Sequence, residues 1–311
     1  MRLWTSWNRA KMSNKQYDIH QSPLYKLNSK SKLSSILHID NLANLLRDGH
    51  YNRFEMNGRQ IESPCKELKR VHKRVLKLLS RINTPGYLIS GKKGLSYVDN
   101  AKAHTRRRNL VKMDIKKFYP SSKKEYVFRL FHYKFRMTED VAWVLTELLT
   151  CDGHIPTGSP VSQILAFMIF ADTFEEINNL AITHGCCFTL YVDDITISST
   201  GDIPSKLSYA IRNELKKINL NLSGKKTRFY SLNKTKCVTG CIITPDGELK
   251  IPNKLHQKIH EKSKMLNKEG LSLHDHQVLF GLLNAAQQIQ KSTFPSLYRE
   301  AKCNFKISVR Q

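Results

Sequence analysis

Apolar residues recur every three or four positions in several segments of the chain, which is the spacing of one buried helix face. The clearest segment follows Ser63 and Pro64, which we expect to be the cap and the first residue of a helix. Its apolar positions are Leu68, Val71, Val75, Leu78 and Leu79. The same spacing predicts helices over 138–149 and 203–218, and a shorter helix capped by Asp40.

Short runs rich in β-branched and aromatic residues lie between these helices. Residues 109–115 predict a buried strand, and 188–192 and 195–198 predict a hairpin because only two residues separate them. Another hairpin is expected over 236–251, followed by helices, while the Gly- and Pro-containing segment 83–108 predicts a loop. Short strands among helices, with a helical tail, indicate an α+β fold with a separate C-terminal unit.

Positive charge dominates the composition. The 311 residues include 51 Lys and Arg against 26 Asp and Glu, a net charge of +25. This surplus favours a polyanionic partner, because each Lys or Arg that contacts a phosphate releases condensed counterions. No apolar run approaches the roughly 18 residues of a membrane span, and the first 15 residues lack a secretory signal. We therefore expect a soluble, cytoplasmic protein that binds nucleic acid and no membrane.

Three carboxylates lie at the ends of predicted buried strands. Asp193 and Asp194 occupy the turn of the hairpin, and Asp114 lies in the last part of the strand 109–115. Adjacent acids in a turn are common, but carboxylates gathered on a buried sheet repel one another unless a cation binds them. Two Mg²⁺ ions held by such acids are a standard device for phosphoryl displacement at a polynucleotide end. By spacing alone, a nuclease fits these acids as well as a polymerase.

Five motifs follow one another along residues 51–240. They are RQIESP with ELK (59–69), MDIKKFYPS (113–121), IPTGSPVS (155–162), YVDD (191–194) and LNLSGKKT (220–227). In this order they resemble the motifs of reverse transcriptases, and more narrowly those of bacterial retron reverse transcriptases.

The resemblance implies a right-hand polymerase fold with fingers, palm and thumb. It places the fingers and palm over 36–240, with an antiparallel palm sheet that carries the catalytic Asp residues. A mostly helical, RNA-binding thumb is expected over 241–311, and a basic N-terminal extension over 1–35. The implied enzyme is an RNA-directed DNA polymerase with two Mg²⁺ ions as cofactors.

Roles for single residues also follow from the resemblance. It implies that Asp114, Asp193 and Asp194 are catalytic and bind the metal ions. The residues expected to bind the nucleotide are Arg59, Tyr119, Gly158 and Lys226. Arg59 would face the triphosphate, Tyr119 would exclude a 2′-OH beneath the sugar, and Lys226 would contact the triphosphate or protonate pyrophosphate. Lys225 is an alternative to Lys226, and core packing is the alternative role of Tyr119.

Two short stretches narrow the resemblance to retrons. Residues 100–104 match the NAxxH signature, and residues 238–240 match the VTG triplet with which retron enzymes recognise their own RNA. The residues expected to bind RNA are Asn100, His104, Val238, Thr239, Gly240, Lys254 and Lys258. An ordinary helix start, a strand end and a solvated lysine face are the alternative interpretations.

A retron enzyme binds a folded noncoding RNA, primes DNA synthesis from the 2′-OH of an internal guanosine and makes a branched RNA–DNA hybrid, msDNA. The resemblance therefore implies a cognate structured RNA, its msDNA product and dNTPs as partners. It also implies an effector protein with which the complex acts in anti-phage defence.

Three positions depart from the family pattern. Thr157 replaces the usual Gln, Gln163 stands where Pro is common, and Val192 replaces the Ala that retrons usually have. Three other classes stay open: a different bacterial reverse transcriptase (group II-intron-like or abortive-infection), a non-catalytic RNA-binding protein and a two-metal nuclease. The GSP loop and the fingers arginine favour a polymerase over the last two.

Overall fold

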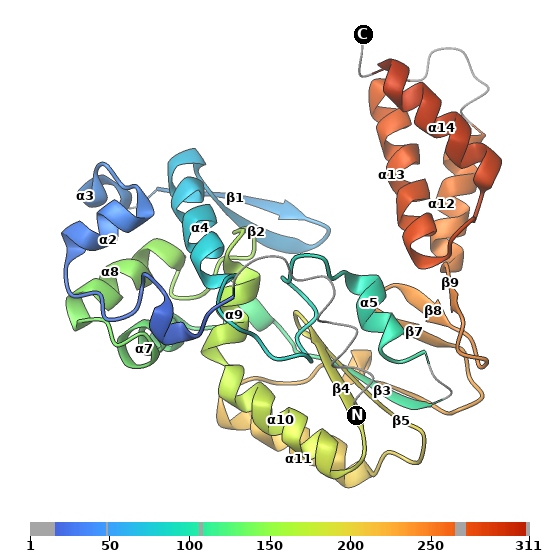
Figure 1. Cartoon of the computed structure of the whole chain (residues 1–311), viewed down its shortest axis with the longest axis horizontal. Helices are drawn as coiled ribbons and strands as arrows, with labels where there is room; N and C mark the ends of the chain where they lie inside the picture. The colour runs from blue at the N-terminus through green and yellow to red at the C-terminus, as the bar shows by residue number, and fades with distance from the viewer. Residues whose placement is uncertain (1–15, 48, 106–107, 265–271, 309–311) are drawn as a thin grey trace.

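The computed structural model describes residues 16–47, 49–105, 108–264 and 272–308, with the backbone alone for 304–308. Figure 1 shows a lobe of helices and a hairpin on one side of a central sheet and a C-terminal group of three helices on the other. This mixture of helices and antiparallel strands confirms the predicted α+β class.

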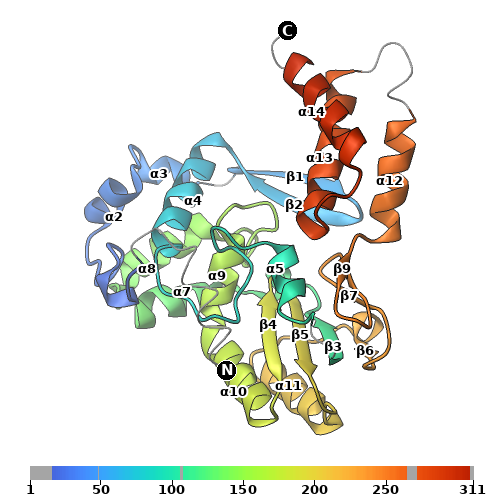
Figure 2. The same cartoon turned by 45° about the vertical axis from the view of Figure 1, so that its right-hand side comes forward.

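The central sheet is antiparallel and has the strand order β4-β5-β3-β6. Its strands are β3 (Asn109–Asp114), β4 (Cys187–Tyr191), β5 (Asp194–Ser199) and β6 (Arg228–Tyr230). Figure 2 shows β4, β5 and β3 side by side. The predicted strand 109–115 and the hairpin 188–198 are thereby confirmed, because buried apolar side chains and a two-residue gap specify both.

Helices connect the strands of this sheet in the sequence and supply most of the main core, the larger of two clusters of buried apolar side chains. They are α6 (Phe118–Ser121), α7 (Lys124–Arg129), the π-helical turn η2 (Leu130–Lys134), α8 (Glu139–Leu149), α9 (Ser162–Ile169), α10 (Ala171–Thr183) and α11 (Ser205–Lys217). The predicted helices 138–149 and 203–218 correspond to α8 and α11. A short 3₁₀ turn, η3 (Gly224–Lys226), precedes β6.

The second lobe contains a hairpin that the periodicity did not predict. Strands β1 (Tyr51–Met56) and β2 (Arg59–Pro64) pair around Asn57 and Gly58, whose φ angles of +54° and +71° suit a tight two-residue turn. Helix α4 (Lys66–Leu79) follows directly. The expectation that Ser63 and Pro64 start this helix is wrong, since both lie in β2 and Cys65 occupies the cap position.

Two further expectations for the N-terminal half need correction. Helix α3 (Leu42–Leu45) is capped by Asn41, whose side chain accepts the N–H of Asn44, so Asp40 is not the cap. The supposed loop 83–108 contains α5 (Tyr97–Lys102), which starts with a capping box formed by Ser96 and Asp99.

The residues before 36 also pack against the body of the protein. After the turn η1 (Ile19–Gln21), helix α2 (Lys30–Leu37) contributes Leu33 and Leu37 to the main core, together with Leu24 and Leu27. The predicted boundary at residue 35 therefore falls inside a helix and marks no break in packing. Residues 1–15 of the expected extension lie outside the described part of the chain.

The C-terminal part has its own core. A three-stranded sheet, β7 (Lys236–Val238), β8 (Cys241–Ile243) and β9 (Leu249–Lys250), leads into α12 (Asn253–Ser263), α13 (Leu273–Ile289) and α14 (Pro295–Ser308). The expected single hairpin over 236–251 is thus two successive turns. The helices confirm the predicted helical tail (Figure 1).

This second core includes side chains from the palm side of the predicted boundary. Its members are Val98, Ala101, Leu110, Val238, Cys241, Ile243, Ile251, Ile259, Leu279, Leu283, Ala286, Ile289 and Ala301. A division at 240/241 would therefore cut both the β7–β8 pair and a shared core. Within the described residues, no helix has the length and apolar character needed to cross a membrane.

Candidate active site

The three predicted catalytic carboxylates meet at one end of the central sheet. Asp114, at the end of β3, pairs in register with Asp194, at the start of β5. Asp193 immediately precedes Asp194 in the β4–β5 turn, and its carbonyl accepts the N–H of Ile115 at 2.9 Å. Strand pairing therefore brings together acids that are distant in the sequence, as their positions at strand ends predicted.

The turn that carries Asp193 is held in an unusual backbone conformation. Val192 has a φ of +58°, which a β-branched residue rarely adopts. Its N–H donates to the Ser90 hydroxyl at 2.9 Å, and the preceding Leu190 forms backbone hydrogen bonds with Tyr87 and Ile89. These contacts from the segment before α5 offset strain of about 1–3 kcal/mol and fix the direction of the acids.

Burial and mutual repulsion perturb these acids. Burial, followed by the charges of Asp114 and Asp194, raises the pKa of Asp193 to about 6. Burial also raises the pKa of Asp194, against the opposing effect of Lys112, whose Nζ lies 3.2 Å from the Asp194 carboxylate. Clustered carboxylate oxygens are the ligands that Mg²⁺ prefers, and a divalent cation would relieve their repulsion. The donor set therefore fits the expected metal ions.

Two of the predicted nucleotide-binding residues lie beside the acids. Lys226 Nζ is 2.8 Å from Asp114 Oδ1, with the lysine side chain 55% exposed. The part-buried Tyr119 adjoins Asp193, since burial and then the Asp193 charge raise the pKa of the Tyr119 phenol. Both placements agree with a nucleotide site next to the acids.

The other two predicted residues belong to the fingers side of the site. Arg59 is exposed at the start of β2, opposite Met56 at the tip of the hairpin. Gly158 lies against the same strand, and its N–H donates to the Glu62 carbonyl at 3.2 Å. A Cβ on Gly158 would lie 2.8 Å from that carbonyl oxygen, so this close approach requires glycine.

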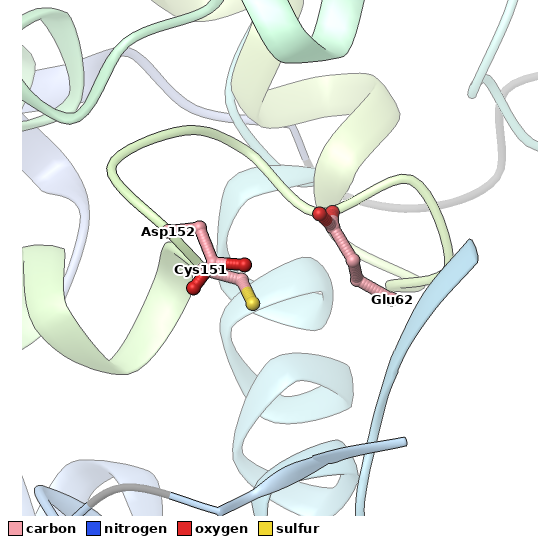
Figure 3. Close-up of side chains that lie close together, drawn as sticks. All are labelled: Glu62, Cys151 and Asp152. Carbon is pink, nitrogen blue, oxygen red and sulfur yellow. The ribbon is translucent and has the colours of Figure 1, made fainter. Parts of the chain in front are cut away.

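A second group of titratable side chains was not predicted. Glu62, Cys151 and Asp152 have ligand atoms within 4.8 Å of one another, where the loop after α8 meets β2 (Figure 3). Arg53 donates to both oxygens of Asp152 at 2.9 and 3.0 Å, and His154 Nε2 lies 3.1 Å from Glu62 Oε1. In the sequence, the Asp152-Gly153 pair indicates only a turn at this position. The contact of this turn with β2 depends on the tertiary fold.

The fixed residues of the retron-like signature, Asn100, Ala101 and His104, are buried, whereas Lys102 between them is exposed. His104 is fully buried, with Nδ1 2.7 Å from the Ser198 hydroxyl and Nε2 2.8 Å from the Thr189 hydroxyl. Burial, with a smaller effect of Arg108, lowers the pKa of His104 to about 3. In this conformation its side chain joins α5 to the palm sheet and has no surface with which to contact RNA directly.

Asn100 is also fully buried, and it supports the VTG turn. Its Nδ2 donates to the Thr239 hydroxyl at 3.4 Å, and that hydroxyl donates to the Tyr97 carbonyl at 2.7 Å. Val238 is buried beneath the turn, whereas Thr239 and Gly240 form its tip with positive φ angles. The expected direct RNA contacts of Asn100, His104 and Val238 therefore become supporting contacts beneath an accessible Thr239-Gly240 tip.

The expected lysine row lies on α12. Lys254 and Lys258 are exposed, as an RNA-binding role requires. Lys262, one turn further on, forms a 2.8 Å ion pair with Asp275 of α13. This ion pair joins α12 to α13. Of the three lysines spaced four residues apart, only Lys254 and Lys258 therefore remain as candidates for RNA contact.

The family profile described as "Reverse transcriptase (RNA-dependent DNA polymerase)" matches residues 54–280. The chain belongs to the reverse transcriptase family. Among solved structures, apo telomerase from Candida tropicalis is similar with a TM-score of 0.51 and 11% identity, over 81% of this chain and 59% of that one. That likeness concerns the fold, and it confirms the predicted right-hand polymerase architecture.

Curated relatives agree with the predicted resemblance to retrons. The chain is 36% identical to the Retron Se72 reverse transcriptase of Salmonella heidelberg over 149 residues, 48% of this chain and 39% of that protein. It is 28% identical to the Retron Ec86 reverse transcriptase of Escherichia coli over 197 residues, 62% of this chain and 60% of that protein. The matched regions thus span about two fifths and three fifths of these two relatives.

Proposed function

We propose that this protein is a retron reverse transcriptase, an RNA-directed DNA polymerase that copies part of a cognate structured RNA. The convergence of Asp114, Asp193 and Asp194 at one sheet end, with a raised Asp193 pKa, is the observation that carries the proposal. DNA synthesis starts from the 2′-OH of a guanosine in that RNA and yields branched msDNA. The complex then acts with an effector protein in anti-phage defence.

Asp114, Asp193 and Asp194 would hold two Mg²⁺ ions, whose positive charge would serve to activate the primer hydroxyl and to neutralise the triphosphate. Lys226 leaves Asp114 and contacts the triphosphate, since its side chain is already half exposed. Arg59 approaches the same phosphates from the hairpin tip. Tyr119 lies beneath the sugar and excludes a 2′-OH, while Gly158, in a loop that packs closely against β2, contacts the nucleotide.

The C-terminal part binds the RNA. Thr239 and Gly240 form an accessible tip held by Asn100 and underlain by Val238, and Lys254 and Lys258 offer exposed charge on α12. The His104 side chain fixes α5, and with it the base of the tip, to the palm sheet. Removing one lysine is expected to flatten the salt dependence of RNA binding by roughly one phosphate contact.

The experiment is to express the gene with its native flanking DNA and to separate small nucleic acids on a denaturing gel. A short DNA that persists through RNase treatment with altered mobility is expected in the wild type. It should be missing from an Asp193→Ala/Asp194→Ala variant of equal expression.

Two other outcomes would change the proposal. Incorporation of dNTPs on an added RNA template, without any such DNA in cells, would keep the polymerase and remove the retron. Mg²⁺-dependent degradation without incorporation would instead identify a nuclease.

A further inference from the structure

A buried histidine joins the fingers to the loop that carries Gly158. His72 lies on α4 and is fully buried. Its Nε2 is 2.7 Å from the Leu148 carbonyl in the last turn of α8, and its Nδ1 is 2.5 Å from the Ser159 hydroxyl. One ring therefore bridges α4, α8 and the segment 156–161, which we call the Gly158 loop.

Hydrogen-bond chemistry fixes the role of each ring nitrogen. A carbonyl only accepts, so Nε2 carries the proton and donates to Leu148. Burial lowers the pKa of His72 to about 4, so the ring is neutral and Nδ1 accepts from the Ser159 hydroxyl. The Ser159 oxygen in turn accepts the N–H of Val161 at 3.3 Å. The chain of bonds thus has one direction, from Val161 through Ser159 and His72 to Leu148.

The same loop is held at its other end by β2. The N–H of Thr157 donates to the Glu62 carboxylate at 3.3 Å, and the N–H of Gly158 donates to the Glu62 carbonyl. Glu62 and His72 belong to consecutive elements of the fingers, β2 and α4. Both ends of the loop are therefore positioned by the fingers, although the loop itself connects α8 with α9.

We infer that His72 is a positioning residue for nucleotide binding: it orients the Gly158 loop through Ser159 and has no contact with the reacting atoms. This inference rests on the proposed polymerase function and on the expected nucleotide contact of Gly158. Without the acceptor at Nδ1, the Ser159 hydroxyl loses its fixed direction and the loop samples orientations that do not fit the nucleotide. We therefore expect weaker dNTP binding when this acceptor is removed.

Two substitutions separate positioning from stability. In His72→Asn, the amide oxygen takes the place of Nδ1 and keeps an acceptor for Ser159, while the bond to Leu148 is lost. In His72→Gln, the amide nitrogen takes the place of Nε2 and keeps the bond to Leu148, while the acceptor for Ser159 is lost. Each variant loses one buried hydrogen bond, so we expect comparable losses of thermal stability.

The assay is Mg²⁺-dependent incorporation of dTTP on poly(rA) primed with oligo(dT). We expect His72→Gln to raise the KM for dTTP about tenfold, equivalent to about 1.4 kcal/mol of binding, with a smaller change in kcat. His72→Asn should stay near the wild-type KM. Adding Ser159→Ala to His72→Gln should raise the KM by less than Ser159→Ala does in the wild type, because the bond between Ser159 and His72 is already lost and only the acceptor for the Val161 N–H remains to be removed.

Equal KM values in the two His72 variants, whether raised or unchanged, would overturn the inference. If neither variant folds, Ser159→Ala removes the bond from the loop side, and an unchanged KM in that variant overturns the inference equally. A wild-type protein that incorporates no dTTP on this template and makes no RNase-resistant short DNA in cells would instead refute the proposed function, and the inference with it.

Discussion

The protein contains two clusters of acids, and they differ in what balances their charge. At the end of the central sheet, Asp114 and Asp194 pair with Lys226 and Lys112, whereas burial and the charges of these two acids raise the pKa of Asp193 to about 6. Where β2 meets the loop after α8, Asp152 and Glu62 each have a basic partner, Arg53 and His154.

The difference shows that proximity of acids does not by itself define a metal site. In the second cluster Arg53 supplies a cation to Asp152 and His154 lies against Glu62, and burial raises the pKa of Cys151 to about 11, so the thiol adds no charge. The Glu62–His154 pair there connects the fingers to the loop after α8. In the first cluster the compensation is incomplete, and an external cation is needed to relieve the repulsion.

The largest expected effect is on activity: a substitution in the first cluster should abolish DNA synthesis, and one in the second should not. Asp193→Ala should reduce dNTP incorporation by roughly a thousandfold or more, because a lost metal ligand costs several kcal/mol of barrier. The matched control is Asp152→Asn in the second cluster, which should retain most of the activity. Primer extension with equal amounts of folded protein measures both, and comparable losses in the two variants would contradict the distinction.

The second expected effect concerns stability and pH. The folded pKa of Asp193, about 6, exceeds its ordinary value of 3.8, so the folded state binds this proton more tightly. The contribution of Asp193 to stability should therefore fall as the pH rises from about 4 to about 6, by about 3 kcal/mol for a shift of about two pKa units.

Asp193→Asn removes this ionisation, so in EDTA it should be more stable than the wild type at neutral pH and equally stable below pH 4. Urea unfolding at several pH values tests this expectation. An Asn variant that is less stable at neutral pH would show that the acids are already compensated.

A smaller effect is expected for the part-buried pair of the second cluster. Glu62→Gln weakens the contact with His154, whose side chain is 15% exposed, and the bond from Thr157. We expect a loss of about 1–2 kcal/mol in the free energy of unfolding, unchanged by EDTA or Mg²⁺. Stabilisation of the wild type by Mg²⁺ that disappears in Glu62→Gln would instead place a metal in this cluster.

The smallest effect is expected for Arg53→Ala. The Arg53 and Asp152 side chains are both more than half exposed, so water and salt screen their attraction. The change in the urea midpoint should be below that of Glu62→Gln and should vanish at high salt. A loss as large as that of Glu62→Gln would show that the contact of Arg53 with the Cys151 thiol carries more weight than the ion pair.

Elements with a clear apolar pattern were predicted correctly from the sequence, and elements without one were missed. The strand that ends in Asp114 and the two strands joined by the Asp193 turn are buried, and their apolar runs predicted both the sheet and the meeting of the acids. Strand β1 exposes most of its side chains on both faces, so it offered no alternation, and only the Asn57-Gly58 pair marked the hairpin.

Buried polar residues were the hardest to place. No motif marks His72, and the motif that contains His104 does not indicate burial; their partners Ser159 and Thr189 lie more than eighty residues away. The signature at 100–104 suggested RNA contact, but a sequence motif does not indicate whether its side chains are exposed or buried. Only the tertiary fold distinguishes a side chain that touches a ligand from one that holds the contacting turn.

Strand β3 separates the two cores, with consequences for dissecting the protein. Leu110 belongs to the second core and Val111 to the main core, and the same strand ends in Asp114. A fragment that stops before β8 would uncover Leu110 together with Val98 and Ala101, three side chains that the C-terminal part now shields from water. We expect such a fragment to be poorly soluble. For the same reason, chimaeras in which the C-terminal part is exchanged with that of a relative should fold poorly.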